Sequence, residues 1–348
     1  MTTGLHPRDR QMAAWLFVCC VLVFGMVVLG GMTRLTGSGL SMVTWEPVKG
    51  ALPPLSEEAW EEMFAQYQQT PEYRKVNTHM DVHDFKGIFW LEYIHRLLGR
   101  LIGIVFLLPF LYFWKKGRIQ PGMTPKLLTM FLLGGLQGLV GWLMVASGLV
   151  NDPHVSQYRL AIHLCMAFII FAYMFWVGLS LWFGEVGSSQ GSGSASLARF
   201  AWAMLALAMV TVFSGGLVAG LKAGLTYNTF PLMDGRLIPA GFLDLSPLWR
   251  NFFENIPTVQ WDHRFLAVST FLGVLALWMK GRREALSPLS RGILHLLLIV
   301  ALVQVGLGIA TLLLVVPIGL AVTHQAGAMI LFTTLLWFVH RLPQARTP

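Results

Sequence analysis

The sequence is poor in charged residues. Only 12% of its 348 residues are Asp, Glu, Lys or Arg, 55% are hydrophobic, and the mean hydropathy is +0.62. A soluble domain carries about 25% charged residues, so this composition excludes an ordinary soluble globule and predicts a chain dissolved in lipid. The net charge of +8 then indicates basic cytoplasmic loops and not a nucleic-acid-binding surface.

Cysteine is also scarce. The three cysteines, Cys19, Cys20 and Cys165, all lie within apolar runs. A disulfide framework or a thiolate metal site would place cysteines in loops, so we expect these three to be packing residues. The first apolar run starts near Gln11 and lacks a small-residue cleavage site. This pattern predicts a retained helix and not a removed signal peptide.

Apolar stretches long enough to cross a bilayer as helices, about 20 residues each, are present in plenty. Eight of them lie near 13–33, 91–114, 127–149, 159–183, 200–221, 263–280, 292–316 and 319–340. An even number places both termini on one side, where the loops are basic, and short basic loops stay in the cytoplasm. We therefore expect cytoplasmic termini in a cell inner membrane, or in a mitochondrial inner membrane if the source is a eukaryote. The outer face carries two long segments, about 34–90 and 222–262.

The chain divides into two similar halves. Residues 184–199 have the Gly/Ser composition of a flexible cytoplasmic linker and separate residues 1–183 from 200–348. Each half holds four predicted spans and so enters the membrane from the same side, as in a direct repeat. Matching segments are Gly30–Leu40 with Gly215–Leu225, Glu92–Arg96 with Gln260–Arg264, and Gln137–Gly141 with Gln304–Gly308, at offsets of 185, 168 and 167. The sequence predicts an all-α integral membrane protein with eight transmembrane helices in two tandem pseudo-symmetric four-helix bundles.

Four histidines occupy matching positions within predicted spans, where an ionisable residue is costly and usually functional. His95 and His163 lie near the start of the second and fourth spans of the first half, and His263 and His324 do so in the second. These two spans run in the same direction, so the histidines of each half share one level near the outer surface. Two imidazoles facing each other across a four-helix bundle suit a haem iron with both axial positions filled. Each pair is therefore predicted to hold one haem.

Other interpretations of the four histidines compete with haem ligation. A lone membrane histidine is more often an interhelical hydrogen-bonding residue, but this leaves the equal depth and repeat symmetry to coincidence. Zinc would want three or four ligands. A separate group, His79 and His83 with Asp81 and Asp84 in the first outer segment, could bind a metal, although a solvated loop is the favoured interpretation.

Residues beside the histidines fit a haem as well. Arg96 and Arg264 directly follow histidines at the outer interface, where haem propionates would want guanidinium partners; an arginine that snorkels to the interface is the alternative. Several glycines of the third spans would let helices, or a flat macrocycle, approach the backbone closely. They are Gly134, Gly135, Gly138 and Gly141, echoed by Gly306 and Gly308.

The halves differ at one informative position. Glu92 lies three residues before His95, on the same helical face, whereas Gln260 occupies the matching place. A carboxylate here can simply pair with Arg96 at i, i+4 and satisfy the helix dipole. A carboxylate near a haem edge can also stabilise developing positive charge or move protons. We hypothesise that the first half does chemistry and the second transfers electrons.

At these residues the sequence resembles the haem A synthase family, in particular its mitochondrial and proteobacterial branch, over nearly the whole chain. The most specific segments are Glu92–Arg96, Asn228–Gly235, Trp261–Arg264 and Thr323–Gly327. Gram-positive members carry a cysteine pair in an outer loop; this sequence has no outer-loop cysteine, which argues against thiol-linked regulation here.

The resemblance implies an enzyme that oxidises the C8 methyl group of haem O to a formyl group, giving haem A for cytochrome oxidase. It implies that His95 and His163 hold the substrate haem, that Glu92 is the catalytic acid, and that His263 and His324 ligate a haem b cofactor. Arg96 and Arg264 would belong to the same two haem sites. Haem O synthase and cytochrome oxidase assembly factors would be partners, and we expect a homo-oligomer. A substrate haem with two histidine ligands has no open iron position, so either one ligand leaves or the oxidant acts from elsewhere.

Two rival functions fit the same residues. A dihaem b-type cytochrome would pass electrons between quinol and a partner without altering either haem. A transporter built from repeated halves would use the histidines for proton coupling, although the tandem His-Arg pairs count against it. Glu92 against Gln260 favours the synthase.

Overall fold

The computed structural model describes residues 7–44, 49–150, 153–184 and 193–343. Within them, eight helices are long and apolar enough to cross a membrane. These are α1 (Pro7–Leu35), α4 (Val82–Lys115), α5 (Met123–Gly148), α6 (Gln157–Phe183), α7 (Ala195–Gly220), α9 (Ile256–Gly281), α10 (Pro288–Leu313) and α11 (Ile318–Arg341). The prediction of eight spans is confirmed.

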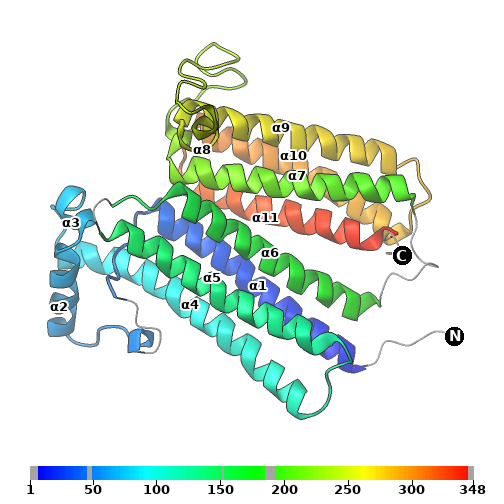
Figure 1. Ribbon diagram of the computed structural model, residues 1–348, viewed down its shortest axis with the longest axis horizontal. Coiled ribbons are helices and arrows are strands. Elements are labelled where there is room, and N and C mark those ends of the chain that lie inside the picture. Colours follow the sequence, from blue (N-terminus) through cyan, green and yellow to red (C-terminus); the bar gives the residue numbers. More distant parts are fainter. Residues whose placement is uncertain (1–6, 45–48, 151–152, 185–192, 344–348) are drawn as a thin grey trace.

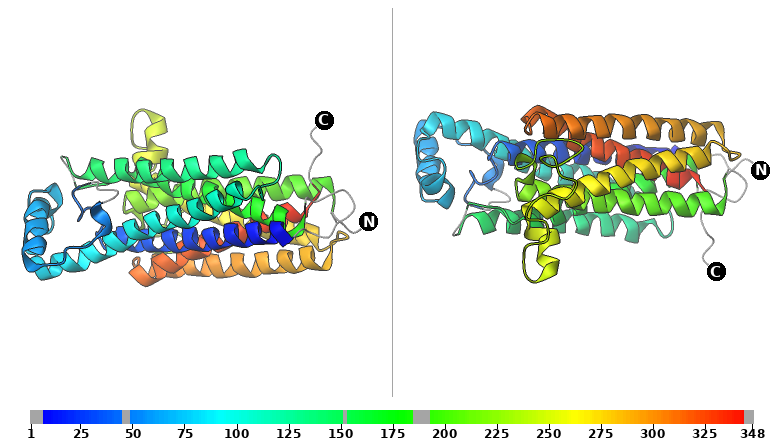
Figure 2. Two further views of the ribbon diagram at one scale, coloured as in Figure 1. Left: turned by 90° about the horizontal axis from the view of Figure 1, so that it is seen from below. Right: turned by 90° about the horizontal axis from the view of Figure 1, so that it is seen from above.

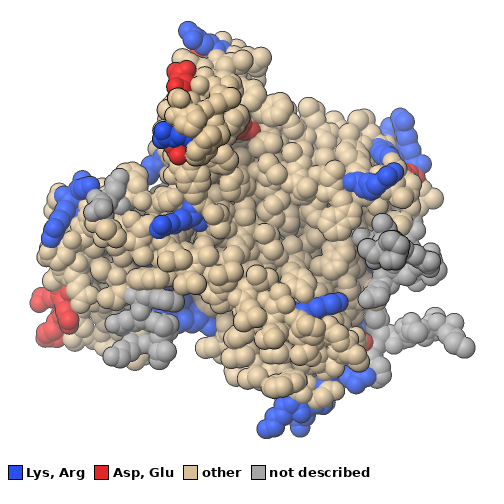
Figure 3. All heavy atoms as spheres, in the orientation of Figure 1, with Lys and Arg blue, Asp and Glu red and all other residues tan. Residues whose placement is uncertain are grey.

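The helices run roughly side by side in two groups (Figure 1). One group contains α1, α4, α5 and α6, and the other contains α7, α9, α10 and α11. On the face drawn in Figure 3, charged side chains gather near the two ends of the helices and leave a broad uncharged band between them. Such a band is what lipid requires of a protein surface, because lipid cannot solvate charge.

The two groups meet through glycines at the crossing of α6 and α7. A Cβ atom added to Gly216 of α7 would lie 2.9 Å from Cα of Ala161 in α6, and one added to Gly220 would lie 2.5 Å from Cα of Gln157. These spacings are too short for any side chain, so the backbones touch. Gly216 and Gly220 form the small-xxx-small pattern that allows close helix packing in lipid.

The end of the bundle that we predict to be the outer one carries short helices that the sequence analysis did not predict. α2 (Glu57–Gln68) and α3 (Pro71–Lys75) cover the outer end of α4, and α8 (Asn251–Glu254) precedes α9 (Figure 2). Trp60, Tyr67, Phe85 and Phe89 form an aromatic cluster there. The first outer segment, expected as a long loop, is therefore a small packed cap.

The spans α4 and α9 begin furthest ahead of their predicted starts, because of their capping residues. Asp81 accepts hydrogen bonds from the backbone N–H groups of His83 and Asp84, which starts α4 at Val82 and not near residue 91. Asn255 caps α9 in the same way. His95 and His263 therefore lie well inside their helices and not at the first turn.

The predicted linker, 184–199, is also shorter than expected. Residues 185–192 lie outside the described residues, but α7 already begins at Ala195, where the Ser194 hydroxyl accepts from the N–H of Leu197. Leu197 is buried; its burial and the serine cap make this segment the first turn of a helix. Cys19 and Cys20 are buried and Cys165 is half-buried; all three are free thiols, as expected of packing residues.

Candidate haem sites

The four predicted histidines come from four different spans, and each imidazole lies against a glycine of a neighbouring helix. A Cβ added to Gly30 of α1 would lie 3.2 Å from Nε2 of His95 in α4, and the matching Gly215 of α7 faces Cε1 of His263 in α9 at 3.1 Å. The histidines of the fourth span in each half, His163 in α6 and His324 in α11, are placed in the same way. Gly141 of α5 and Gly308 of α10 face Cε1 of His163 and His324, each at 2.9 Å.

The glycines give the four rings room that any side chain would take away. Two of them, Gly141 and Gly308, belong to the group that the sequence analysis marked for close approach, whereas Gly134, Gly135, Gly138 and Gly306 have nothing within 4 Å of an added Cβ. Of the six glycines marked in the third spans, only Gly141 and Gly308 therefore make room for a histidine. The other four face open space.

The structure brings the histidines together in the predicted pairs. His95 is close enough to His163 for their charges to interact, and His263 stands in the same relation to His324. Nδ1 of His163 is buried and has no hydrogen-bond partner among the described residues. A buried, unpartnered imidazole nitrogen is costly, and a metal ligand bond would satisfy it.

Arg96 and Arg264 bind equivalent loop carbonyls in the two halves. Arg96 donates through Nη2 to the carbonyl of Met42 at 2.9 Å and through Nη1 to that of Thr44 at 3.0 Å. Arg264 donates through the same nitrogens to the carbonyls of Tyr227 and Thr229, at 2.7 and 2.8 Å. Met42 and Tyr227 are 185 positions apart in the sequence, and so are Thr44 and Thr229. The same offset relates α1 to α7, the helices that precede these loops.

The arginines therefore fasten the loop that follows the first helix of each half. Arg96 also bonds to Glu92 through Nε and Nη2, which leaves little of its guanidinium for another partner. Arg264 keeps one buried donor, Nε, that has no partner among the described residues. Pairing with a haem propionate stays a prediction for both arginines. Arg264 is the better candidate, because its Nε is still available to donate.

Glu92 is the most heavily bonded side chain of the site. One oxygen, Oε2, accepts from the Ser41 hydroxyl at 2.6 Å and from the backbone N–H groups of Ser41 and Met42 at 2.8 and 2.9 Å. The other, Oε1, accepts from Arg96. The residue is 2% exposed. The i, i+4 ion pair that the sequence analysis offered as the structural role is present.

Gln260, the counterpart of Glu92, is equally buried and binds the loop with reversed polarity. Its Nε2 donates to the Tyr227 carbonyl at 2.9 Å, while its Oε1 has no partner among the described residues. An amide can donate to a carbonyl, whereas a carboxylate needs donors. The asymmetry between the halves is therefore built into the loops as well as into the helix.

The second possible metal group in the outer cap has a structural explanation. Asp81, His83 and Asp84 place ligand atoms within 4.8 Å of one another, but all three are exposed. Asp81 already serves as the cap of α4, and His79 is not a member of the group. The favoured interpretation, a solvated surface, stays a prediction.

The donor set fits a haem in each half. Each site offers two imidazoles from opposing helices, a glycine against each ring, and in the first half an imidazole nitrogen without a partner. No third nitrogen, thiolate or carboxylate ligand that zinc would need accompanies either pair among the described residues.

Comparisons with known proteins agree with this geometry. A family model described as "Cytochrome oxidase assembly protein" matches residues 13–336. The chain belongs to this family. It is 55% identical to the heme A synthase of Nitrosospira multiformis over 96% of this chain and 94% of the relative, and 52% identical to that of Nitrosomonas eutropha over the same shares. The heme A synthase of Paramagnetospirillum magneticum is 50% identical, over 98% of this chain and 96% of the relative.

In this member of the cytochrome oxidase assembly family, sequence reasoning missed the role of two glutamines. Nε2 of Gln137 donates to the backbone carbonyl of His163, and Nε2 of Gln304 donates to that of His324, both at 3.0 Å. The same amide nitrogens approach the imidazoles, at 3.4 Å from Nε2 of His163 and 3.1 Å from Nδ1 of His324. The repeat of Gln137–Gly141 at Gln304–Gly308 was the available signal.

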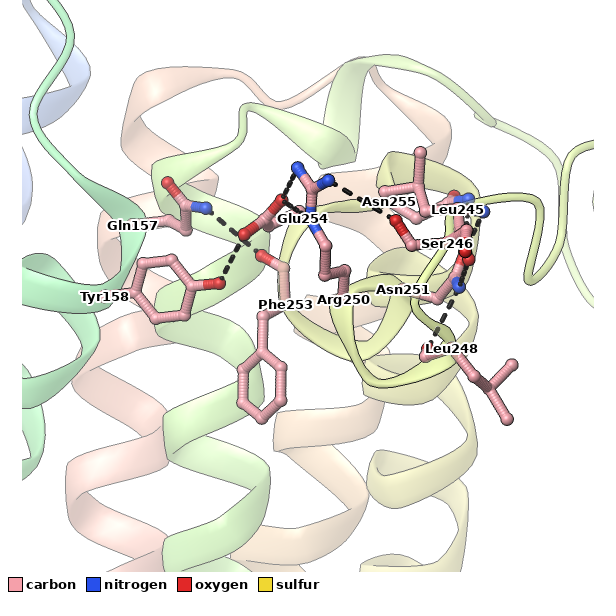
Figure 4. Close-up of polar contacts among 10 residues, drawn as sticks. All are labelled: Gln157, Tyr158, Leu245, Ser246, Leu248, Arg250, Asn251, Phe253, Glu254 and Asn255. Atoms are coloured by element: carbon pink, nitrogen blue, oxygen red, sulfur yellow. Dashed lines mark hydrogen bonds and ion pairs between the residues drawn. The ribbon is translucent and has the colours of Figure 1, made fainter.

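A polar clasp also joins the two halves of this family member at the outer surface (Figure 4). Tyr158 of α6 donates to Oε1 of Glu254 in α8 at 2.9 Å, and Arg250 binds Oε2 of the same carboxylate at 2.6 Å. Gln157 donates to the carbonyl of Phe253 at 3.3 Å. The clasp ties the helix that carries His163 to the outer loop that precedes the helix carrying His263.

Proposed function

We propose that this protein is a haem A synthase, a membrane oxidoreductase that converts the C8 methyl group of haem O into the formyl group of haem A. The observation that carries the proposal is 55% identity to a heme A synthase over 96% of this chain, with a half-buried histidine pair in each half. The substrate would be haem O and the product haem A. The family to which the chain belongs is described as cytochrome oxidase assembly proteins.

We assign the two haems to different roles. His95 and His163 would hold the substrate haem, and His263 and His324 would hold a haem b cofactor. The carboxylate of Glu92 in the first half supports this assignment, because Gln260 in the second cannot exchange a proton in the same way. The haem iron supplies the redox chemistry when bound.

The residues of the first half would position the substrate and manage protons. The short contact between Ser41 Oγ and Glu92 Oε2, at 2.6 Å, joins two groups that can share a proton near the outer end of the site. Arg96 holds the carboxylate through Oε1 and fastens the loop across it. Glu92 is the proposed acid of the reaction, held in place by donors on both oxygens.

The surrounding assignments follow from the charge pattern and the family. Basic residues at the ends of α4 and α9, including Lys115, Lys280 and Arg282, lie on the side we propose to be cytoplasmic, with the haem sites toward the outer face of an inner membrane. Haem O synthase, cytochrome oxidase assembly factors and a second copy of the chain are the proposed partners.

The proposal is tested by turnover in a host that makes haem O but no haem A. Expression of the chain should produce haem A, identified by its mass in extracted pigments, and a variant carrying His95→Ala and His163→Ala should not. A matched control is His295→Ala, which changes a histidine at the other end of the molecule. Haem O alone after expression of folded wild-type protein would overturn the proposal.

A further inference from the structure

Ser214 of α7 holds one ring nitrogen of His263. Its Oγ lies 2.8 Å from Nδ1 of His263, and Oγ also donates to the backbone carbonyl of Thr211 at 2.8 Å. A hydroxyl has a single proton. Two oxygens 2.8 Å apart repel each other unless a proton lies between them, so the proton of Ser214 belongs on the Thr211 contact. Ser214 then accepts at its other contact, and Nδ1 of His263 is the donor.

This bond selects the tautomer of His263. A neutral imidazole that carries its proton on Nδ1 has its lone pair on Nε2. Nε2 is then the nitrogen that can bind a metal, with Nδ1 held by an outer partner as is usual for ligating histidines. The serine is itself buried, with an exposed fraction of 5%, so water does not compete for the bond.

A second layer of hydroxyls supports the serine. Oγ1 of Thr211 donates to the carbonyl of Leu207 at 2.9 Å and lies 2.8 Å from Oγ1 of Thr270 in α9. Because Thr211 gives its single hydroxyl proton to the Leu207 carbonyl, the Thr270 hydroxyl is the donor to Thr211. The chain of hydroxyls thus links α7 to α9, the helix that carries His263, and fixes the turn whose carbonyl receives the Ser214 proton.

The first half lacks this chain. At the offset of 185 that relates α1 to α7, Ser214 matches Leu29 and Thr211 matches Met26; at the offset of 168 that relates α4 to α9, Thr270 matches Ile102. All three counterparts are apolar. Among the described residues, no side-chain hydroxyl bonds to the ring of His95.

We propose that Ser214 is a positioning residue that fixes the Nδ1–H tautomer of His263 and makes the second half the site of the retained haem. This inference rests on the proposed function. A ligand held in its metal-binding tautomer keeps its haem tightly, whereas His95, without such a bond, can release a haem that must enter as substrate and leave as product. The hydroxyl of Ser214 thus contributes to the tighter retention of the second-half haem compared with the first-half haem.

The test is the haem of the second half in purified full-length protein, measured by its midpoint potential and by its retention after detergent washing. An Nδ1–H bond increases the electron donation of an imidazole and favours ferric iron. Ser214→Ala should therefore raise the midpoint potential and weaken the binding of haem b on the order of 10-fold, the lower end of the usual effect of an outer partner.

Three further variants make the result specific. Ser214→Thr keeps the hydroxyl and should restore the wild-type potential. Thr270→Val removes only the second layer and should shift the potential in the same direction by a smaller amount. Leu29→Ala, at the matching position of the first half, should leave the potential of the second-half haem unchanged.

Each outcome decides the matter. Equal potentials and equal haem retention in Ser214→Ala and wild type would overturn the inference while leaving the synthase proposal intact. A wild-type protein that holds no haem b would instead overturn the proposed function. If Ser214→Ala does not fold, Thr270→Val and Ser214→Thr decide: a shift in the first with none in the second supports the inference, and any other pattern contradicts it.

Discussion

Glu92 receives both Nε and Nη2 of Arg96 on one carboxylate oxygen, at 3.0 and 2.6 Å, while its other oxygen receives the loop at Ser41 and Met42. A buried carboxylate so surrounded by donors is held in one position. The same geometry suits a proton-handling group of fixed place and a structural anchor of the loop. Mutation separates the two roles.

Replacing Glu92 with Gln should abolish turnover and leave the haem of the second half in place. The amide loses its charge and must present an NH₂ group to donors, so stability should also fall, by about 1.5–3 kcal/mol per charged hydrogen bond lost. Haem A formation and thermal unfolding in detergent measure the two effects.

Ser41→Ala is the control for the Glu92 variant. It removes one donor to Oε2 but keeps the carboxylate. If Glu92 only anchors the loop, activity should fall in proportion to stability in both variants. Ser41→Ala, which destabilises the loop less than Glu92→Gln, should then lose correspondingly less activity. Unchanged turnover in Glu92→Gln would rule out a catalytic role for this residue.

The glycines that face the fourth-helix histidines should be irreplaceable. A Cβ at Gly141 would meet Cε1 of His163 at 2.9 Å, so Gly141→Ala should displace the ring and release the haem of the first half. Gly308→Ala should do the same to the second half through His324. The ratio of haem to protein after purification measures both.

Matched controls exist on the same helices. Gly138 and Gly306 have nothing within 4 Å of an added Cβ, so alanine there should leave haem content unchanged and favour the helix by roughly 1 kcal/mol. Loss of haem in these controls would show that the third helices are sensitive to any substitution, and the specific role of Gly141 and Gly308 would be lost.

The outer cap should become less stable as the pH rises. Burial raises the pKa of the Glu72 carboxyl from 4.5 to about 7, and the charge of Glu92 adds to this, while the Tyr67 hydroxyl and Lys222 oppose it. The folded cap therefore binds the proton more tightly than the unfolded chain does. Its free energy of unfolding is greatest below pH 4.5 and decreases as the pH rises through about 7.

Glu72→Gln should remove this dependence and make the cap more stable than wild type above pH 7. Hydrogen exchange of α2 and α3 between pH 5 and 8, corrected for the intrinsic rate, measures it. Glu61→Gln, an exposed glutamate of α2, is the control and should follow wild type. A wild-type cap with equal protection across this range contradicts the expectation.

The clasp between the halves should contribute modestly to stability. Tyr158→Phe removes the hydroxyl that donates to Glu254 and keeps the stacking on Phe253. The expected loss is about 1 kcal/mol, because the carboxylate retains Arg250 and is partly exposed. Thermal unfolding of the purified protein measures it, and a loss several times larger would mean that the clasp controls the packing of the halves.

Much of this architecture could be predicted from the sequence because its causes are local. Apolar length determines the spans, and the offsets 185 and 168 locate residues that turn out to make equivalent bonds, such as Arg96 with Thr44 and Arg264 with Thr229. The histidine pairs followed from the direction of the helices. These features depend on composition and spacing alone.

The features that were missed depend on contacts across the fold. Ser214 looks like an ordinary small residue of a span until α9 places His263 beside it, and Gln137 meets His163 only through helix packing. The helices of the outer cap were hidden because the aromatic residues between 60 and 89 are scattered in sequence. Capping by Asp81 and Asn255 extended two spans beyond their apolar runs.

The central claim is that the two halves hold two different haems, and analysis of the pigments in the purified protein tests it most directly. Wild type should yield haem b together with haem O or haem A, identified by mass and optical spectrum. His95→Ala with His163→Ala should retain haem b only, and His263→Ala with His324→Ala should lose it. Haem b alone, in both halves of the wild type, would contradict the account and make the protein an electron-transfer cytochrome; absence of any haem would contradict it entirely.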